Sequence, residues 1–166
     1  MQGRKTSDMK KTLLFILPVV LCFAVGGVSA AAMAGSLKTW YPFLVKPALT
    51  PPGMAFPIAW SIIYLLAGLS AGLVLTSHRT SHRTSRRTAM TLWFAQLLLN
   101  MMWSFLFFAF RLPWAAFADI VLLAAALVLY MIFAWRHSRA ASLLFIPYLC
   151  WTLFATYLNV YIAVCN

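Results

Sequence analysis

Hydrophobic residues along this chain gather in five long stretches that are separated by polar breaks. Each stretch reaches the roughly 20 apolar residues that an α-helix needs to cross the hydrocarbon core of a membrane. The approximate ranges are 12–35, 53–75, 89–110, 113–135 and 140–164. The pattern therefore predicts an all-α membrane protein, with one domain over residues 1–166 that forms a bundle of five transmembrane helices.

One break is long, at residues 36–52, and it is rich in proline. Trp40 and Tyr41 lie near its start, and Gly53 follows its end. Proline fixes φ and restricts the residue before it, so we expect this loop to be stiff and extended. We interpret it as a lid over one mouth of the bundle. The prolines of this region are Pro42, Pro47, Pro51, Pro52 and Pro57.

The composition excludes an ordinary soluble domain. Hydrophobic residues make up 64% of the chain and charged residues only 9%, against about 25% charged residues in soluble domains. The net charge of +11 comes from 13 Lys and Arg residues against 2 acidic ones. Because the basic residues lie in the breaks, they favour anionic membrane lipid over nucleic acid as a partner.

The distribution of these cations predicts the orientation. Ten lie at the N-terminus and in the second and fourth breaks, against three in the first and third breaks. This bias places the N-terminus inside and the C-terminus outside, as is typical of a bacterial inner-membrane protein. The proline-rich loop is then on the outer side.

Two polar segments have alternative interpretations. Lys10, Lys11 and the later "VSAAAMA" resemble a cleaved secretory signal, but the apolar stretch exceeds the usual 7–15 residues, which favours a retained helix. The second break, "TSHRTSHRTSRRT", is either a pH-sensing or nucleic-acid-binding tract or a solvated basic loop that anchors helix ends to lipid. We favour the basic loop.

The cysteines and small residues indicate packing. Cys22, Cys150 and Cys165 show no metal-binding spacing, so no metal site is predicted, and we expect Cys22 and Cys150 to be buried. Two runs with small residues at every fourth position permit close helix contacts, within the bundle or in a homodimer. They are Gly27-x3-Ala31-x3-Gly35 and Gly68-x3-Gly72.

The tryptophans fall into two groups. Trp93, Trp114 and Trp135 lie near helix ends, where indoles form an interfacial belt. Trp60, Trp103 and Trp151 lie deeper, in the half of the bundle that carries the loop. Gln96, Asn100 and Trp103 share one helix face because their spacing is i, i+4 and i+7. This convergence predicts an aromatic pocket beneath the loop.

Four linked motifs resemble the tryptophan-rich sensory protein, or translocator protein, family. The first is W-Y-x4-K-P-x2-T-P-P-x3-F-x3-W-x3-Y, from Trp40 to Tyr64. The second is Q-x3-N-x2-W-S-x2-F-F, from Gln96 to Phe108. The third is the intramembrane Asp119, and the fourth is P-Y-x2-W-x2-F-A-x-Y-L-N, from Pro147 to Asn159. The match runs in order through about three quarters of the chain.

The resemblance implies a five-helix bundle, commonly a homodimer, that binds porphyrins as a membrane receptor or carrier. The alternative that it implies is an enzyme that promotes light-dependent oxidative breakdown of protoporphyrin, with Trp60 and Trp151 as the candidate catalytic pair. Some members bind sterols, but the sterol-associated end of the fifth helix lacks its basic residue here. The ligand-binding positions carried over are Trp40, Tyr41, Pro51, Trp60, Asn100, Trp103, Trp151 and Ala155.

The available chemistry favours a bound ligand over a built-in cofactor. His78, His82 and His137 all fall in predicted breaks, so an internal axial histidine for haem is not expected. We expect no required cofactor, and metal-free porphyrin or loosely held haem as the ligand. Lys38 and Lys46 are candidates to meet its propionates. Asp119 is either a proton relay or a structural polar contact, and we favour the latter.

Overall fold

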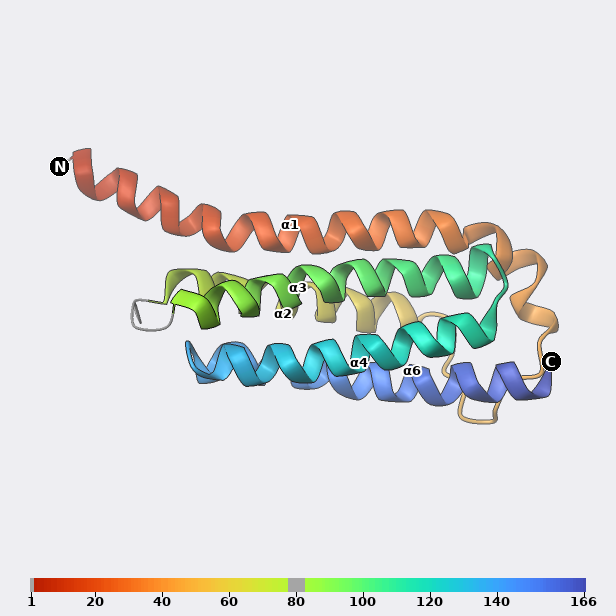
Figure 1. The fold of residues 1–166 in the computed structure, drawn as a ribbon. Helices are drawn as coiled ribbons and strands as arrows, with labels where there is room; N and C mark the ends of the chain where they lie inside the picture. Colours follow the sequence, from red (N-terminus) through yellow and green to blue (C-terminus); the bar gives the residue numbers. More distant parts are fainter. Residues whose placement is uncertain (1, 78–82) are drawn as a thin grey trace.

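The computed structural model describes residues 2–77 and 83–166, and Figure 1 shows their course. Within these ranges, five helical spans are long and apolar enough to cross a membrane. Part of the basic repeat in the second break, including His78 and His82, lies outside the described residues. The elements are α1 (Gln2–Thr39), η1 (Tyr41–Phe43), α2 (Ala55–Thr76), α3 (Arg83–Ser104), the π-helix η3 (Phe105–Ala109), α4 (Pro113–Trp135), α5 (Arg139–Leu143) and α6 (Ile146–Cys165).

Some helices begin or end at other residues than expected, because hydropathy marks the membrane-spanning part of a helix and not its ends. α4 has the expected bounds, Pro113–Trp135. α1 extends beyond 12–35 at both ends, because a helix can continue past the apolar stretch that marks its membrane part. The expected fifth helix is divided into α5 and α6 at residues 144–145. Pro147 lies at the start of α6, where it lacks an N–H group and restricts the residue before it.

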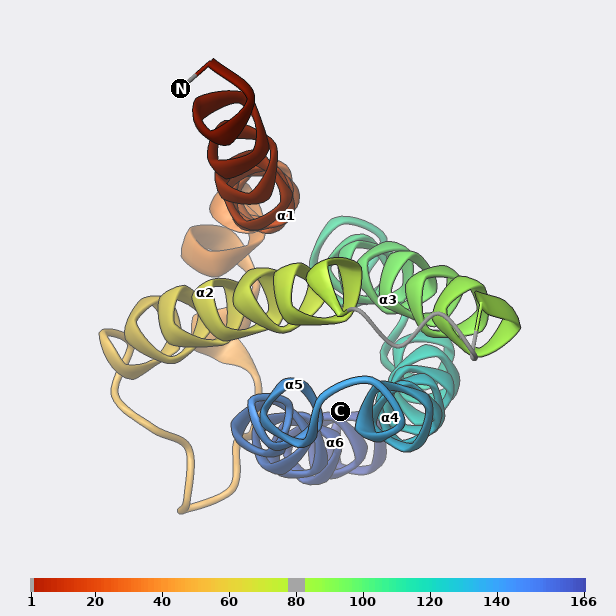
Figure 2. The same ribbon diagram turned by 90° about the vertical axis from the view of Figure 1, so that its left-hand side faces the viewer.

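The helices run side by side along one axis, with the N-terminus at one end and the C-terminus at the other (Figure 1). α1 packs along α2 and α3, α3 packs on α4, and α4 packs on α6. Figure 2 looks along this axis, with α2 lying between α1 and the α5–α6 pair. Large apolar side chains such as Leu122 (60% exposed) and Leu98 (57% exposed) face outward. Such an apolar exterior suits lipid as the surrounding solvent.

Two of the glycines let α1 and α2 approach closely. A Cβ atom on Gly68 would meet the backbone of Val19, and one on Gly72 would meet the ring of Phe15. A Cβ atom on Gly27 or Gly35 would meet no heavy atom of the described residues within 4 Å, so their side of α1 faces away from the bundle. The second small-residue run therefore serves the bundle, and the first run does not.

Two expectations about burial are wrong. Trp114 and Trp135 face outward (57% and 46% exposed), as belt residues do, but Trp93 is only 1% exposed. Its indole N–H donates to the Ala67 carbonyl of α2 at 3.0 Å. Trp93 is therefore buried because it lies on the side of its helix that faces α2, although it is near the helix end. Cys22 is buried as expected, whereas Cys150 is exposed on the outer face of α6.

Candidate functional site

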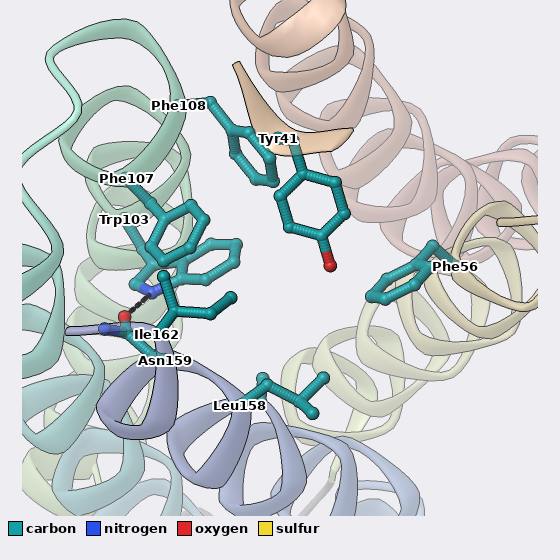
Figure 3. Close-up of a pocket in the computed structure, with 9 residues that line it drawn as sticks. Tyr41, Phe56, Trp103, Phe107, Phe108, Leu158, Asn159 and Ile162 are labelled. Atoms are coloured by element: carbon teal, nitrogen blue, oxygen red, sulfur yellow. Dashed lines mark hydrogen bonds between the residues drawn. The ribbon is translucent and has the colours of Figure 1, made fainter. Parts of the chain in front are cut away.

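A small cavity lies beneath the proline-rich loop, where α2 begins and where η3 and α6 approach their outer ends. Its volume is about 30 Å³. Figure 3 shows the lining side chains, with the Tyr41 hydroxyl directed into the space toward Phe56. Burial raises the pKa of the Tyr41 hydroxyl, which keeps it a neutral donor. The lining residues are Tyr41, Phe56, Trp103, Phe107, Phe108, Ala155, Leu158, Asn159 and Ile162.

Aromatic rings from the loop and from α3–η3 form one wall of the cavity. The Trp103 and Phe107 rings are stacked, with centroids 5.3 Å apart. The Trp40 ring packs edge-on against Phe107 at 5.7 Å, and the Tyr41 ring lies 5.7 Å from Phe108. The loop therefore contributes Tyr41 to the cavity lining, while Trp40 supports the wall through its contact with Phe107.

The π-helix turns two consecutive phenylalanines toward the cavity. A π-helix carries one more residue per turn than an α-helix, and it frequently marks a functional site. Phe107 and Phe108 are 2% and 7% exposed. The Ser36 hydroxyl of α1 donates to the Phe108 carbonyl at 2.5 Å, which ties the end of α1 to this turn. These phenylalanines belong to the F-F pair of the sequence motif, but regular helical spacing does not predict that both are buried.

A polar clamp holds Trp103 against α6. Its indole N–H donates to Asn159 Oδ1 at 2.9 Å, as Figure 3 shows. Asn159 Nδ2 in turn donates to the Pro113 carbonyl at 2.8 Å. One amide side chain therefore connects α3, α4 and α6 at the base of the aromatic wall, and Asn159 is a site residue that the binding-site prediction omitted.

The second aromatic layer lies deeper in the bundle. Trp60 stacks on Tyr64 at 5.4 Å and packs edge-on against Tyr148 at 5.9 Å. The Tyr64 hydroxyl donates to Asn100 Oδ1 at 3.2 Å. Trp151 packs edge-on against Phe56 at 5.7 Å. Phe56 lines the cavity, whereas Trp151 is not among the lining residues.

The predicted ligand-binding residues are thus divided between two layers. Tyr41, Trp103 and Ala155 line the cavity. Trp40 packs behind Phe107, while Trp60 and Asn100 belong to the deeper layer. Pro51 is half-buried in the loop and is not among the lining residues.

Lys46 braces the loop internally, and Asn166 ties it to the end of α6. The Lys46 ammonium donates to the carbonyl oxygens of Tyr41 (2.9 Å), Leu44 (3.0 Å) and Pro42 (3.1 Å). It is therefore engaged by the loop itself, whereas Lys38, the other lysine that the sequence suggested for a propionate, is exposed near the end of α1. The Asn166 side chain accepts from Val45 N at 2.9 Å and donates to Val45 O at 3.2 Å.

Arg111 covers the outer edge of the wall. It has a left-handed backbone conformation (φ 56°) in the turn between η3 and α4, which is uncommon for a residue other than glycine. Its guanidinium lies 5.9 Å from the centroid of the Trp40 ring, within the range of a cation–π interaction. This contact could not be predicted from the sequence, because it depends on the conformation of the turn.

Comparison with known proteins shows similarity over nearly the whole chain. A sequence model of the TspO/MBR family matches residues 18–165. The chain is 38% identical over 150 residues to the tryptophan-rich protein TspO of Chlorobaculum tepidum, covering 90% of this chain and 94% of that protein. It is 36% identical over 154 residues to the protein of the same name from Archaeoglobus fulgidus (93% and 97% covered). It is 28% identical over 144 residues to the human translocator protein (87% and 82% covered).

Proposed function

Because this chain belongs to the TspO/MBR family and is an integral, multi-pass membrane protein, we propose that it is a receptor or carrier for porphyrin-type ligands. The observation that carries this proposal is the aromatic wall of Trp40, Trp103 and Phe107 beneath the loop. Relatives named a sensory protein and a translocator protein support a role in sensing or carrying a ligand.

The chemistry of the cavity suits a flat, mostly apolar ring. Indole and phenyl faces offer large contact areas to such a ring and prefer offset or edge-on contacts with it. The Tyr41 hydroxyl and the Asn159 amide supply polar groups at the margin of an otherwise apolar lining, which is the usual balance in a small-molecule site.

The size of the cavity requires that binding open it. Ligand pockets usually measure roughly 300–1,000 Å³, about tenfold more than the 30 Å³ observed. On this proposal, the structure is a closed conformation. We propose that the loop opens by releasing the contact between Val45 and Asn166, since this contact ties the loop to the end of α6.

The test is a titration of purified protein with protoporphyrin, haem and cholesterol side by side, monitored by visible absorption for the two tetrapyrroles and by displacement for cholesterol. Trp103→Phe removes the bond to Asn159 and part of the aromatic wall. We expect its Kd for protoporphyrin to rise about tenfold, the equivalent of 1.4 kcal/mol. The matched control is Trp114→Phe, since Trp114 is 57% exposed on the outer face. Equal affinities for both variants and the unchanged protein would overturn the proposal.

A second candidate function is light-dependent oxidation of bound porphyrin with dissolved oxygen as the oxidant. Two positions favour it: Trp60 is stacked on Tyr64, and Trp151 packs against Phe56, which lines the cavity. Indole and phenol groups in such contacts are oxidisable. Illumination should then bleach the porphyrin absorption band more slowly with Trp60→Phe or Trp151→Phe. The same bleaching rate with heat-denatured protein argues against catalysis.

We further propose that the loop-bearing end faces outward across a bacterial inner membrane. Lys10, Lys11, Arg136 and Arg139 belong to the opposite end of the molecule, which Figure 1 places with the N-terminus, and the excess of cations belongs inside. Cys165 is exposed near the loop. A membrane-impermeant thiol reagent added to intact cells should therefore label Cys165, and a Cys165→Ser variant is the control. If Cys165 is labelled only after the cells are broken, the opposite orientation is correct.

A further inference from the structure

Three buried polar side chains from three helices lie beneath the aromatic cavity. They are Gln96 of α3, Asp119 of α4 and Thr152 of α6, which are 0%, 8% and 1% exposed. Both amide atoms of Gln96, the Oδ2 atom of Asp119 and the hydroxyl of Thr152 have no hydrogen-bond partner among the described residues. A buried polar group without a protein partner is costly, and water or an ion commonly satisfies it.

The three side chains lie at one depth in the bundle. Asn159 bonds to both Trp103 and Pro113, which sets α3, α4 and α6 in register at that point. Gln96 and Thr152 each lie seven residues before the bonded residue of their own helix, and Asp119 lies six residues after Pro113. At 1.5 Å per residue, each is roughly 9–10 Å deeper than this reference point. α4 packs on both α3 and α6, so the helices that carry the three side chains are neighbours at this depth.

The charge of Asp119 has no counter-ion among the side chains at this depth. It is the only charged residue in the five apolar stretches, which contain no Lys, Arg or His. An ionised carboxylate in such surroundings is strongly unfavourable unless a cation pairs with it. Gln96 and Thr152, which are buried at the same depth, offer a carbonyl oxygen and a hydroxyl oxygen, which are ligands for hard cations such as Na⁺.

We propose that Gln96, Asp119 and Thr152 bind a monovalent cation, Na⁺, within the bundle. The carboxylate of Asp119 neutralises the ion, and the oxygens of Gln96 and Thr152 complete one side of its coordination. Water supplies the remaining ligands, and the N–H groups of Gln96 donate to that water. The Tyr148 hydroxyl, one turn from Thr152 on α6, also lacks a hydrogen bond to any of the described residues and belongs to the same polar layer.

The site adjoins the proposed ligand cavity without being part of it. Thr152 is one turn below Ala155, which lines the cavity, and Gln96 is one turn below Asn100. An ion that joins three helices here stabilises the closed bundle whether or not a ligand binds above. The proposal therefore goes beyond the porphyrin-binding function, and its test needs no porphyrin.

The test compares thermal unfolding of the purified full chain in NaCl and in N-methylglucamine chloride at equal ionic strength. A ligand that binds only the folded state stabilises it in proportion to the logarithm of its concentration. We expect Na⁺ to raise the unfolding midpoint with the logarithm of its concentration, by about 3–6 °C at tenfold excess over its dissociation constant. Asp119→Asn, which keeps the shape and removes the charge, should abolish the Na⁺ dependence.

A second pair of variants keeps the test decisive if Asp119→Asn does not fold. Thr152→Val removes a ligand oxygen. It should raise at least fivefold the Na⁺ concentration that is needed for a given rise in the unfolding midpoint. Thr156→Val is the matched control, because its hydroxyl already bonds to the Thr152 carbonyl at 2.8 Å, and it should respond as the unchanged protein does. If Na⁺ has no effect on the unchanged protein, Asp119 is protonated and only water occupies the site, and the proposal is overturned. An effect that persists in Asp119→Asn or is undiminished in Thr152→Val would overturn it equally.

Discussion

At the scale of single residues, two indoles that donate between helices illustrate what a polar group requires inside a membrane. Trp93 and Trp103 each donate their N–H to an acceptor on another helix, the Ala67 carbonyl and the Asn159 amide. The bilayer core offers no water to replace such a partner. Each indole therefore fixes a contact between helices as well as filling space.

This gives a prediction for Trp93→Phe. The change retains an aromatic ring but removes the donor to Ala67, and interhelical side-chain bonds in membranes contribute about 1 kcal/mol. We expect the free energy of unfolding in detergent to fall by at least that amount, measured by titration with a denaturing detergent. Trp114→Phe, on the outer face, should leave it nearly unchanged. Equal effects of both changes would mean that the Trp93 bond contributes nothing.

The sequence predicted that aromatic residues gather beneath the loop, but not which of them line the cavity. Tyr41, Trp103 and Ala155 were predicted and line the cavity, whereas Trp60 and Asn100 lie in the layer below. Sequence spacing places a residue along a helix, but which aromatic ring borders the cavity depends on helix tilt and on the neighbouring side chains. The π-helix adds to this limit, because it brings Phe107 and Phe108 inward together.

At the scale of elements, hydropathy identified the five spans, and local chemistry decided their ends. α4 begins at Pro113 as expected, since proline is favourable in the first helical turn. The break before α6 was missed because Leu144 and Phe145 are as apolar as the helices on either side. Apolar continuity indicates membrane depth and says little about a turn within it.

Gly68 gives the element-scale prediction, because the backbones of α1 and α2 approach at this residue. In Gly68→Val, the new side chain meets the backbone of Val19, which cannot move without shifting the whole helix. Overpacking of this kind costs about 1–3 kcal/mol. We expect a lower unfolding midpoint, measured by thermal unfolding in detergent. An unchanged midpoint would show that α1 and α2 separate easily.

Gly27→Val is the matched contrast on α1. Its Cβ position is open, so the fold should keep its stability. We propose that the outward run with Gly27, Ala31 and Gly35 forms a homodimer contact, because small residues at this spacing allow two helices to pack closely. Gly27→Val should then raise the dimer dissociation constant at least fivefold, measured by single-molecule or ultracentrifuge analysis in detergent. A monomeric unchanged protein, or an unaltered dimer in the variant, would refute this contact.

At the scale of the whole molecule, the loop and the last helix form a closure around the cavity. Asn166 reaches from the end of α6 to both backbone groups of Val45 and to the Ile162 carbonyl. The contact joins segments 121 residues apart in the chain. Since the observed cavity is far smaller than a porphyrin, any binding of that ligand requires this closure to open.

A reversible cross-link between Val45 and Asn166 tests this requirement. In a variant with Val45→Cys and Asn166→Cys, and with the native Cys22, Cys150 and Cys165 replaced by serine, oxidation should join the loop to α6. Because the Asn166 side chain already makes two hydrogen bonds to the Val45 backbone, we expect cysteines at these two positions to be close enough to form a disulfide. We expect protoporphyrin binding to fall at least tenfold on oxidation and to return on reduction, as measured by absorption titration. The single Val45→Cys variant in the same serine background should bind equally in both states. Full binding by the oxidised double variant would show that the ligand enters elsewhere, between helices instead of beneath the loop.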